Sequence, residues 1–208
     1  MIRMSSFWWV LLAGAIFGLI HSIFASNRVK DLAARWLGEK SRKYYRLFFS
    51  TMAGVSSLIF LGVVFLLPDE LIYLIPAPWV YLTLIIQLAA FLGAARALAQ
   101  INTADFLGFA TLRKRGLSQS SDQPPVLVTR GLYGLVRHPI YTCSFVFLIF
   151  FPWMSWNLLG FIIAVIVYTI IGAFLEERKM VQIYGEEYIR YQKQVPMFLL
   201  LPFTKGRS

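Results

Sequence analysis

Long apolar runs constrain this chain more than any other feature of its sequence. Residues 7–25, 47–67, 79–99 and 157–175 form runs of membrane length, and a shorter run covers 140–151. Only 14% of the residues are charged and the mean hydropathy is +0.65, whereas about a quarter of a soluble domain is charged. The sequence therefore predicts an all-α integral membrane protein with about five transmembrane helices. No small-residue cleavage site follows the first run, which disfavours a signal peptide.

The positive charges lie in alternate polar segments. The chain carries a net charge of +10, and its basic residues gather in 28–46, 113–137 and 178–207. The segment 68–78 contains only Asp69 and Glu70 as charged residues. Because Lys and Arg are enriched on the cytoplasmic side of membranes, this pattern predicts an external N-terminus and a cytoplasmic C-terminus. The same placement in membrane-flanking loops argues against nucleic acid as a partner.

Two polar clusters flank the last pair of apolar runs. RHPIY stands at 137–141 and EERK at 176–179, with about 35 mostly apolar residues between them. Pro139 suits the first turn of a helix, because that position needs no backbone N–H donor and takes the fixed φ of proline. A helical hairpin of this length would bring both clusters to one face of the membrane. We therefore expect them to form a joint site.

The pattern over residues 129–196 resembles the isoprenylcysteine carboxyl methyltransferase and phospholipid methyltransferase superfamily. It consists of TRGLYGLVRHPIY, the apolar hairpin, EE, YGEEYIRY and VP. Two shorter stretches, IHSIFASNRVK at 20–30 and INTADFLGF at 101–109, look like the bacterial NnrU and methanethiol S-methyltransferase branch. The resemblance implies an S-adenosylmethionine-dependent methyltransferase in the membrane, with the bacterial inner membrane as its expected location.

The resemblance also implies residue roles. Family positions that contact S-adenosylmethionine match Leu127, Val128, Tyr133, His138, Pro139, Ile140, Tyr141 and Glu176. Arg137 and Glu177 are expected to form a charge pair that joins the two clusters. Residues 176–194 place apolar and tyrosine side chains at three- and four-residue steps, which predicts a cytoplasmic amphipathic helix. By its family position, this helix would also wall the cofactor pocket.

The methyl acceptor is predicted from one position at which this sequence departs from the family pattern. Gly172 stands four residues before Glu176, where carboxyl-methylating relatives keep an arginine, and this favours a small thiol. His21 and Asp105 are the candidate catalytic residues, with His21 orienting the thiol or accepting its proton. Their structural alternatives are a helix-end histidine bonded to a backbone carbonyl and a helix-capping aspartate.

The sequence alone leaves other interpretations open. Residues 1–208 are expected to form one membrane domain, with N-terminal helices in 1–112 and the cofactor region in 113–208. Alternative functions are isoprenylcysteine carboxyl methylation, phospholipid N-methylation, NADPH-dependent sterol reduction, or a non-enzymatic role in nitrogen-oxide metabolism. Expected partners are a small or lipophilic methyl acceptor and membrane lipids. Two histidines and one cysteine make an all-protein zinc site unexpected, so no metal is assigned.

Overall fold

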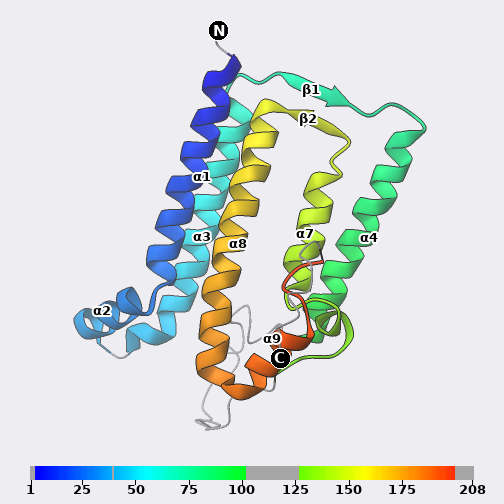
Figure 1. The fold of residues 1–208 in the computed structure, drawn as a ribbon. Coiled ribbons are helices and arrows are strands. Elements are labelled where there is room, and N and C mark those ends of the chain that lie inside the picture. Colours follow the sequence, from blue (N-terminus) through cyan, green and yellow to red (C-terminus); the bar gives the residue numbers. More distant parts are fainter. Residues whose placement is uncertain (1–2, 39, 102–126, 200–208) are drawn as a thin grey trace. The chain divides into compact units, whose positions relative to one another are not determined.

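The computed structural model describes residues 3–38, 40–101 and 127–199 (Figure 1). Its helices are α1 (Arg3–Ala25), α2 (Asn27–Leu37), α3 (Lys40–Leu66), α4 (Trp79–Gln100), α7 (Pro139–Ile149), α8 (Trp156–Tyr184) and α9 (Glu186–Gln194). A 3₁₀ helix, η1 (Gly131–Gly134), precedes α7, and the strands β1 (Leu71–Leu74) and β2 (Trp153–Ser155) pair antiparallel. Within the described ranges, α1, α3, α4 and α8 contain segments long and apolar enough to cross a membrane. This agrees with a mostly helical integral membrane protein.

The fourth predicted run gives a shorter helix than the others. α7 contains 11 residues and is about 16 Å long, roughly half the thickness of a hydrocarbon core. Its N-terminus is set by Pro139 at the first helical position. The small β1–β2 sheet was not predicted, and it lies outside an all-α description.

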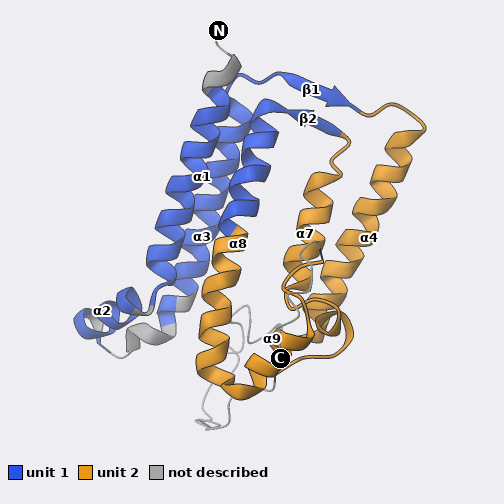
Figure 2. Ribbon diagram, in the orientation of Figure 1, with its two compact units in different colours: residues 1–74, 153–168 blue, residues 75–152, 169–208 orange. Residues whose placement is uncertain are grey.

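Two compact units make up the chain (Figure 2). Unit 1 comprises Met1–Leu74 and Trp153–Tyr168, and unit 2 comprises Ile75–Pro152 and Thr169–Ser208. α8 therefore contributes its first half to unit 1 and its second half to unit 2. Each unit is described below by itself.

Unit 1 packs α1, α3 and the first half of α8 around an apolar core. Val10, Phe60 and Val64 are its buried residues. A Cβ at Gly14 would lie 2.6 Å from Ala164 Cβ, so only glycine lets α1 and α8 approach this closely. The fully buried Asn157 donates from Nδ2 to the carbonyls of Val64 and Leu67, each at 3.1 Å. It thus satisfies carbonyl groups that the end of α3 leaves free.

Unit 2 is built on an antiparallel pairing of α4 with the segment that contains η1 and α7. The Gln87 side chain donates to Phe147 O at 3.0 Å, and a Cβ at Gly93 would lie 2.9 Å from Cys143 Sγ. Near the end of α4, Gln100 Oε1 accepts from Leu132 N at 3.2 Å. At the opposite end, Ile75 N donates to Pro152 O at 2.9 Å. The segment from η1 to Pro152 therefore follows the whole length of α4.

The C-terminal helix differs from the prediction. The sequence predicts one amphipathic helix over 176–194, whereas α8 continues to Tyr184 and α9 begins at Glu186. Gly185 separates them with φ 58° and ψ −131°, a conformation that side chains disfavour. Tyr188 and Tyr191 are buried, as the predicted apolar face requires.

Candidate active site

The RHP segment is fixed by backbone hydrogen bonds to the C-terminal segment of unit 2. Arg137 N donates to Pro196 O at 2.9 Å, and His138 N donates to Met197 O at 3.2 Å. His138 then precedes the first turn of α7, and its carbonyl accepts from Thr142 N at 3.0 Å. Two residues of the motif are thereby held on both sides, by α7 and by the segment after α9.

Arg137 joins three segments of unit 2. Its guanidinium donates to both carboxylate oxygens of Glu177, from Nε at 2.5 Å and from Nη2 at 2.9 Å. Nη1 donates to Gln192 O at 3.0 Å and to Val195 O at 2.5 Å. The pairing is bidentate and nearly buried, with side-chain exposures of 10% for Arg137 and 9% for Glu177. The predicted charge pair is thus present.

Glu177 accepts from two further side chains. His138 Nε2 lies 3.3 Å from Glu177 Oε1, and Gln192 Nε2 donates to Glu177 Oε2 at 2.8 Å. If His138 is neutral, a proton on Nε2 gives this contact its donor, and Nδ1 is then left as an acceptor. Glu177 therefore orients the His138 ring as well as neutralising Arg137.

Glu176 has a more open environment. Its side chain is 39% exposed, and its Oε2 accepts from Tyr141 OH at 3.0 Å. His138 Nδ1 lies 3.9 Å from the same oxygen. The rings of His138 and Tyr141 stack with centroids 5.3 Å apart and an interplanar angle of 6°. Among the described residues, Glu176 Oε1 accepts no hydrogen bond, so it is left as an accessible acceptor.

Three tyrosines surround these carboxylates. Burial and the charge of Glu176 raise the pKa of Tyr133, and burial is the main reason why the pKa values of Tyr188 and Tyr191 are raised strongly. All three phenols are therefore neutral at physiological pH. Tyr191 OH donates to Tyr133 O at 2.5 Å, which ties α9 to η1. The amphipathic helix thus supports the motif directly.

The structure brings together part of the predicted cofactor set. His138, Tyr141 and Glu176 are in contact, and Tyr133 lies close enough to respond to the charge of Glu176. Pro139 and Ile140 begin α7, while the half-buried Leu127 and Val128 precede η1 in the chain.

The two catalytic candidates lie elsewhere in the chain. His21 belongs to unit 1, where its ring packs against Phe17, Phe49 and Tyr168, and its buried Nδ1 has no hydrogen-bond partner among the described residues. In the described part of the chain, no backbone carbonyl accepts a hydrogen bond from His21 Nδ1. Asp105 lies outside the described residues.

Some contributors were not predicted from the sequence. Gln192, the carbonyls of Val195 and Pro196, and the Phe198 ring, 5.7 Å from the His138 ring, all help to hold the RHP segment. The VP pair of the motif was the only signal for this role, because a backbone acceptor leaves no requirement for a particular side chain. No group of three or more possible metal ligands occurs in the described part of the chain.

The chain is similar to known methyltransferases. Residues 86–187, which include both clusters, match the family described as phospholipid methyltransferase. The chain is 28% identical over 197 residues to methanethiol S-methyltransferase 1 of Bradyrhizobium diazoefficiens, covering 94% of this chain and 67% of that protein. It is 38% identical over 80 residues to methanethiol S-methyltransferase of Crocosphaera subtropica, covering 38% of this chain and 31% of that protein.

A more distant relative is protein-S-isoprenylcysteine O-methyltransferase of Mus musculus, 37% identical over 92 residues, with 43% of this chain and 31% of that protein covered. The chain thus spans about two thirds of the first relative and about a third of the other two. No solved structure matches it significantly. These matches confirm the resemblance to methyltransferases, and the match to the phospholipid methyltransferase family contains both the RHPIY and the EE clusters.

Proposed function

We propose that this chain is an integral-membrane methyltransferase that uses S-adenosylmethionine and methylates a small thiol. The observation that carries the proposal is the contact between the RHPIY and EE clusters, which meet as Tyr141–Glu176 and Arg137–Glu177 pairs. The family that matches residues 86–187 and the similar proteins are named as methyltransferases, which supports the reaction class.

The residues around Glu176 fit this cofactor chemically. Its accessible carboxylate oxygen suits the ribose hydroxyls or the ammonium group, since both can donate hydrogen bonds. The rings of Tyr133 and Tyr141 lie near Glu176, and aromatic faces attract cations such as a sulfonium. The proposed cofactor-binding residues are Leu127, Val128, Tyr133, His138, Pro139, Ile140, Tyr141 and Glu176.

Methyl transfer depends mainly on the alignment of the nucleophile, the methyl carbon and the sulfonium sulfur, and less on proton transfer. When bound, S-adenosylmethionine supplies an electrophilic methyl group on a sulfonium. Glu176, Tyr141 and His138 would hold it in one orientation, because His138 is itself fixed by Glu177 and by α7. Correct alignment of reacting groups is worth several kcal/mol, up to about 7–11. The buried Arg137–Glu177 pair would keep this arrangement rigid.

A small thiol is the acceptor that the observations favour. One relative named methanethiol S-methyltransferase matches 94% of the chain, and another with that name matches 38% of it. At Gly172, where a carboxylate-binding arginine would stand in the carboxyl-methylating relatives, a Cβ would meet no atom within 4 Å. The position thus offers space but no cation for a substrate carboxylate. His21 and Asp105 stay the proposed catalytic residues, His21 as the group that orients the thiol or accepts its proton.

The proposed location is a bacterial inner membrane. The path of the chain fits five membrane crossings. β1 precedes α4 and β2 follows α7, and the two strands pair, so the chain must return to its starting side after α4 crosses. The segment from η1 through α7 follows the whole length of α4 and would make this return crossing. With the loop charges, this path favours an external N-terminus and a cytoplasmic α9.

The test is transfer of a labelled methyl group by the purified protein. S-adenosylmethionine carrying the label is supplied with methanethiol in one arm and with a farnesyl-cysteine analogue in the other. We expect labelled dimethyl sulfide and no labelled methyl ester. Methylation of the farnesyl compound alone would replace the thiol reading with carboxyl methylation, and cofactor binding without either product would leave the methyltransferase class with a different acceptor.

A further inference from the structure

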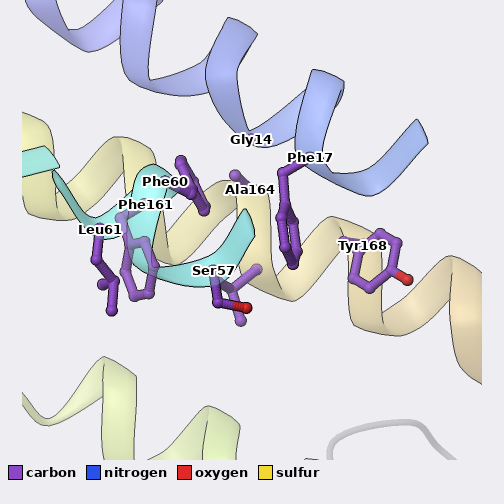
Figure 3. A pocket seen from close by; sticks show the side chains of 9 residues that line it. Gly14, Phe17, Ser57, Phe60, Leu61, Phe161, Ala164 and Tyr168 are labelled. Carbon is purple, nitrogen blue, oxygen red and sulfur yellow. The ribbon is translucent and has the colours of Figure 1, made fainter. Parts of the chain in front are cut away.

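Unit 1 contains a pocket that the proposed cofactor site does not use. It has a volume of about 190 Å³ and lies among α1, α3 and the first half of α8 (Figure 3). The four aromatic rings that line it belong to Phe17, Phe60, Phe161 and Tyr168, and the remaining lining residues are Gly14, Ser57, Leu61, Ala164 and Val165. The close approach of α1 to α8 at Gly14 fixes one wall.

The size of the pocket sets an upper limit on its ligand. An engineered apolar cavity of about 150 Å³ binds benzene. A pocket of about 190 Å³ therefore admits a compound of a few heavy atoms. A prenyl chain or an adenosyl group would be too large to enter completely.

The lining sets the chemical class. No lining residue is charged, so an ionic ligand would lose its hydration without compensation. The four rings suit sulfur, because polarisable sulfur makes favourable contacts with aromatic edges. In the described part of the chain the Ser57 hydroxyl has no hydrogen-bond partner, whereas the adjacent Ser56 donates to Ala53 O at 3.1 Å. Ser57 is therefore free to donate to a sulfur atom or to accept from a weak S–H donor.

We infer that this pocket binds a small uncharged thiol. The choice of a thiol over other small sulfur compounds rests on the proposed function, whereas the size limit and the exclusion of ions rest on the pocket alone. Aromatic rings provide the apolar contact, and Ser57 provides the one polar contact that distinguishes the thiol from a hydrocarbon of equal size.

The experiment measures equilibrium binding of 1-butanethiol to the full chain in nanodiscs, without cofactor. Val165→Phe places a ring in the pocket, and Val167→Phe is its matched control, because Val167 is 50% exposed on the same helix. We expect saturable binding in the wild type and in Val167→Phe, and at least tenfold weaker binding in Val165→Phe. Equal binding in both variants would overturn the inference.

Two further arms keep the test decisive. Should Val165→Phe not fold, Ser57→Val fills part of the pocket from α3 and removes the hydroxyl, and it should weaken 1-butanethiol binding severalfold. n-Pentane has the same number of heavy atoms and should bind severalfold more weakly than 1-butanethiol to the wild type. Equal binding of n-pentane would make the pocket a general apolar site and overturn the thiol assignment.

The result of the binding test can be distinguished from the result of the methyl-transfer test. Saturable thiol binding that Val165→Phe abolishes, together with no methyl transfer, would reject the methyltransferase proposal and keep the thiol pocket. Methyl transfer to methanethiol, together with thiol binding that Val165→Phe does not change, would keep the methyltransferase proposal and reject the thiol pocket.

Discussion

At the scale of residues, the adjacent Glu176 and Glu177 have different roles. Glu177 is nearly buried and its carboxylate is shared by Arg137, His138 and Gln192. Glu176 is 39% exposed and has one oxygen without a partner among the described residues. Since α8 turns by about 100° per residue, neighbouring side chains point in different directions. One glutamate therefore holds the motif together and the other is available to a ligand.

Replacing Glu176 by Gln should weaken cofactor binding and leave the fold intact. A lost hydrogen bond to a charged group is worth about 1.5–3 kcal/mol, so the dissociation constant for S-adenosylmethionine should rise roughly tenfold or more. Calorimetry on the purified variant measures it. Glu187→Gln is the matched control, because Glu187 is exposed on α9 and should bind like the wild type. Unchanged affinity in a folded Glu176→Gln protein would remove this residue from the site.

Replacing Glu177 by Gln should instead cost stability. Arg137 would keep its charge in a nearly buried position without its carboxylate, and removing one partner of a buried ion pair costs about 3–5 kcal/mol. The apparent unfolding temperature in detergent should fall well below that of Glu176→Gln, which serves as the control. Equal unfolding temperatures for the two variants would show that the pair contributes little.

The side-chain contacts of this site were more predictable from the sequence than its backbone contacts. The RHPIY and EE clusters were predicted to meet and to form an Arg137–Glu177 pair, because such a pair needs particular side chains, and the structure adds contacts of His138 and Tyr141 with the glutamates. The carbonyls of Val195 and Pro196 could not be predicted this way, since any residue supplies a carbonyl.

At the scale of elements, Gly185 separates α8 from α9. Its φ of 58° and ψ of −131° let the chain turn so that Tyr188 and Tyr191 are buried and Tyr191 reaches Tyr133 O. A single straight helix would carry α9 onward along the axis of α8. The turn therefore determines where Tyr188 and Tyr191 lie. It also allows Tyr191 to hold η1 through Tyr133 O.

Gly185→Ala should destabilise unit 2. A Cβ there meets no atom within 4 Å, so the cost comes from the backbone conformation alone, about 1–3 kcal/mol. Gly172→Ala is the matched control: its Cβ also meets nothing within 4 Å, but it lies within helix α8, where alanine is favoured over glycine. Thermal unfolding should rank Gly185→Ala lowest of the three proteins. A Gly185→Ala protein as stable as Gly172→Ala would contradict the strain argument.

Element lengths were predictable where the bilayer sets them. The four long apolar runs correspond to α1, α3, α4 and α8, because crossing a hydrocarbon core requires a helix of about 20 residues. The break at Gly185 was missed because the tyrosine spacing continues across it. The β1–β2 pairing joins residues about 80 positions apart, and no local pattern encodes such a pairing.

At the scale of the whole molecule, the decisive question is how often the chain crosses the membrane. The four long helices alone would return the chain to its starting side, whereas a fifth crossing through η1 and α7 would not. The antiparallel β1–β2 pairing requires residues 71–74 and 153–155 to be on one side. α4 lies between them, so if α4 crosses once, as its length and hydropathy allow, the pairing predicts another crossing after it.

Reporter fusions after Asp69 and after Ser208 should therefore report opposite compartments. The loop at Asp69 carries only acidic charges and is expected outside, while the basic segment after α8 is expected in the cytoplasm. Alkaline phosphatase is active outside the cytoplasm and green fluorescent protein inside it, so each position is tested with both reporters. A third fusion after Gln100 should match the one after Ser208, because one further pair of crossings, η1–α7 and α8, separates them. Fusions after Asp69 and Ser208 in the same compartment would show an even number of crossings between them and would reject the path through η1 and α7.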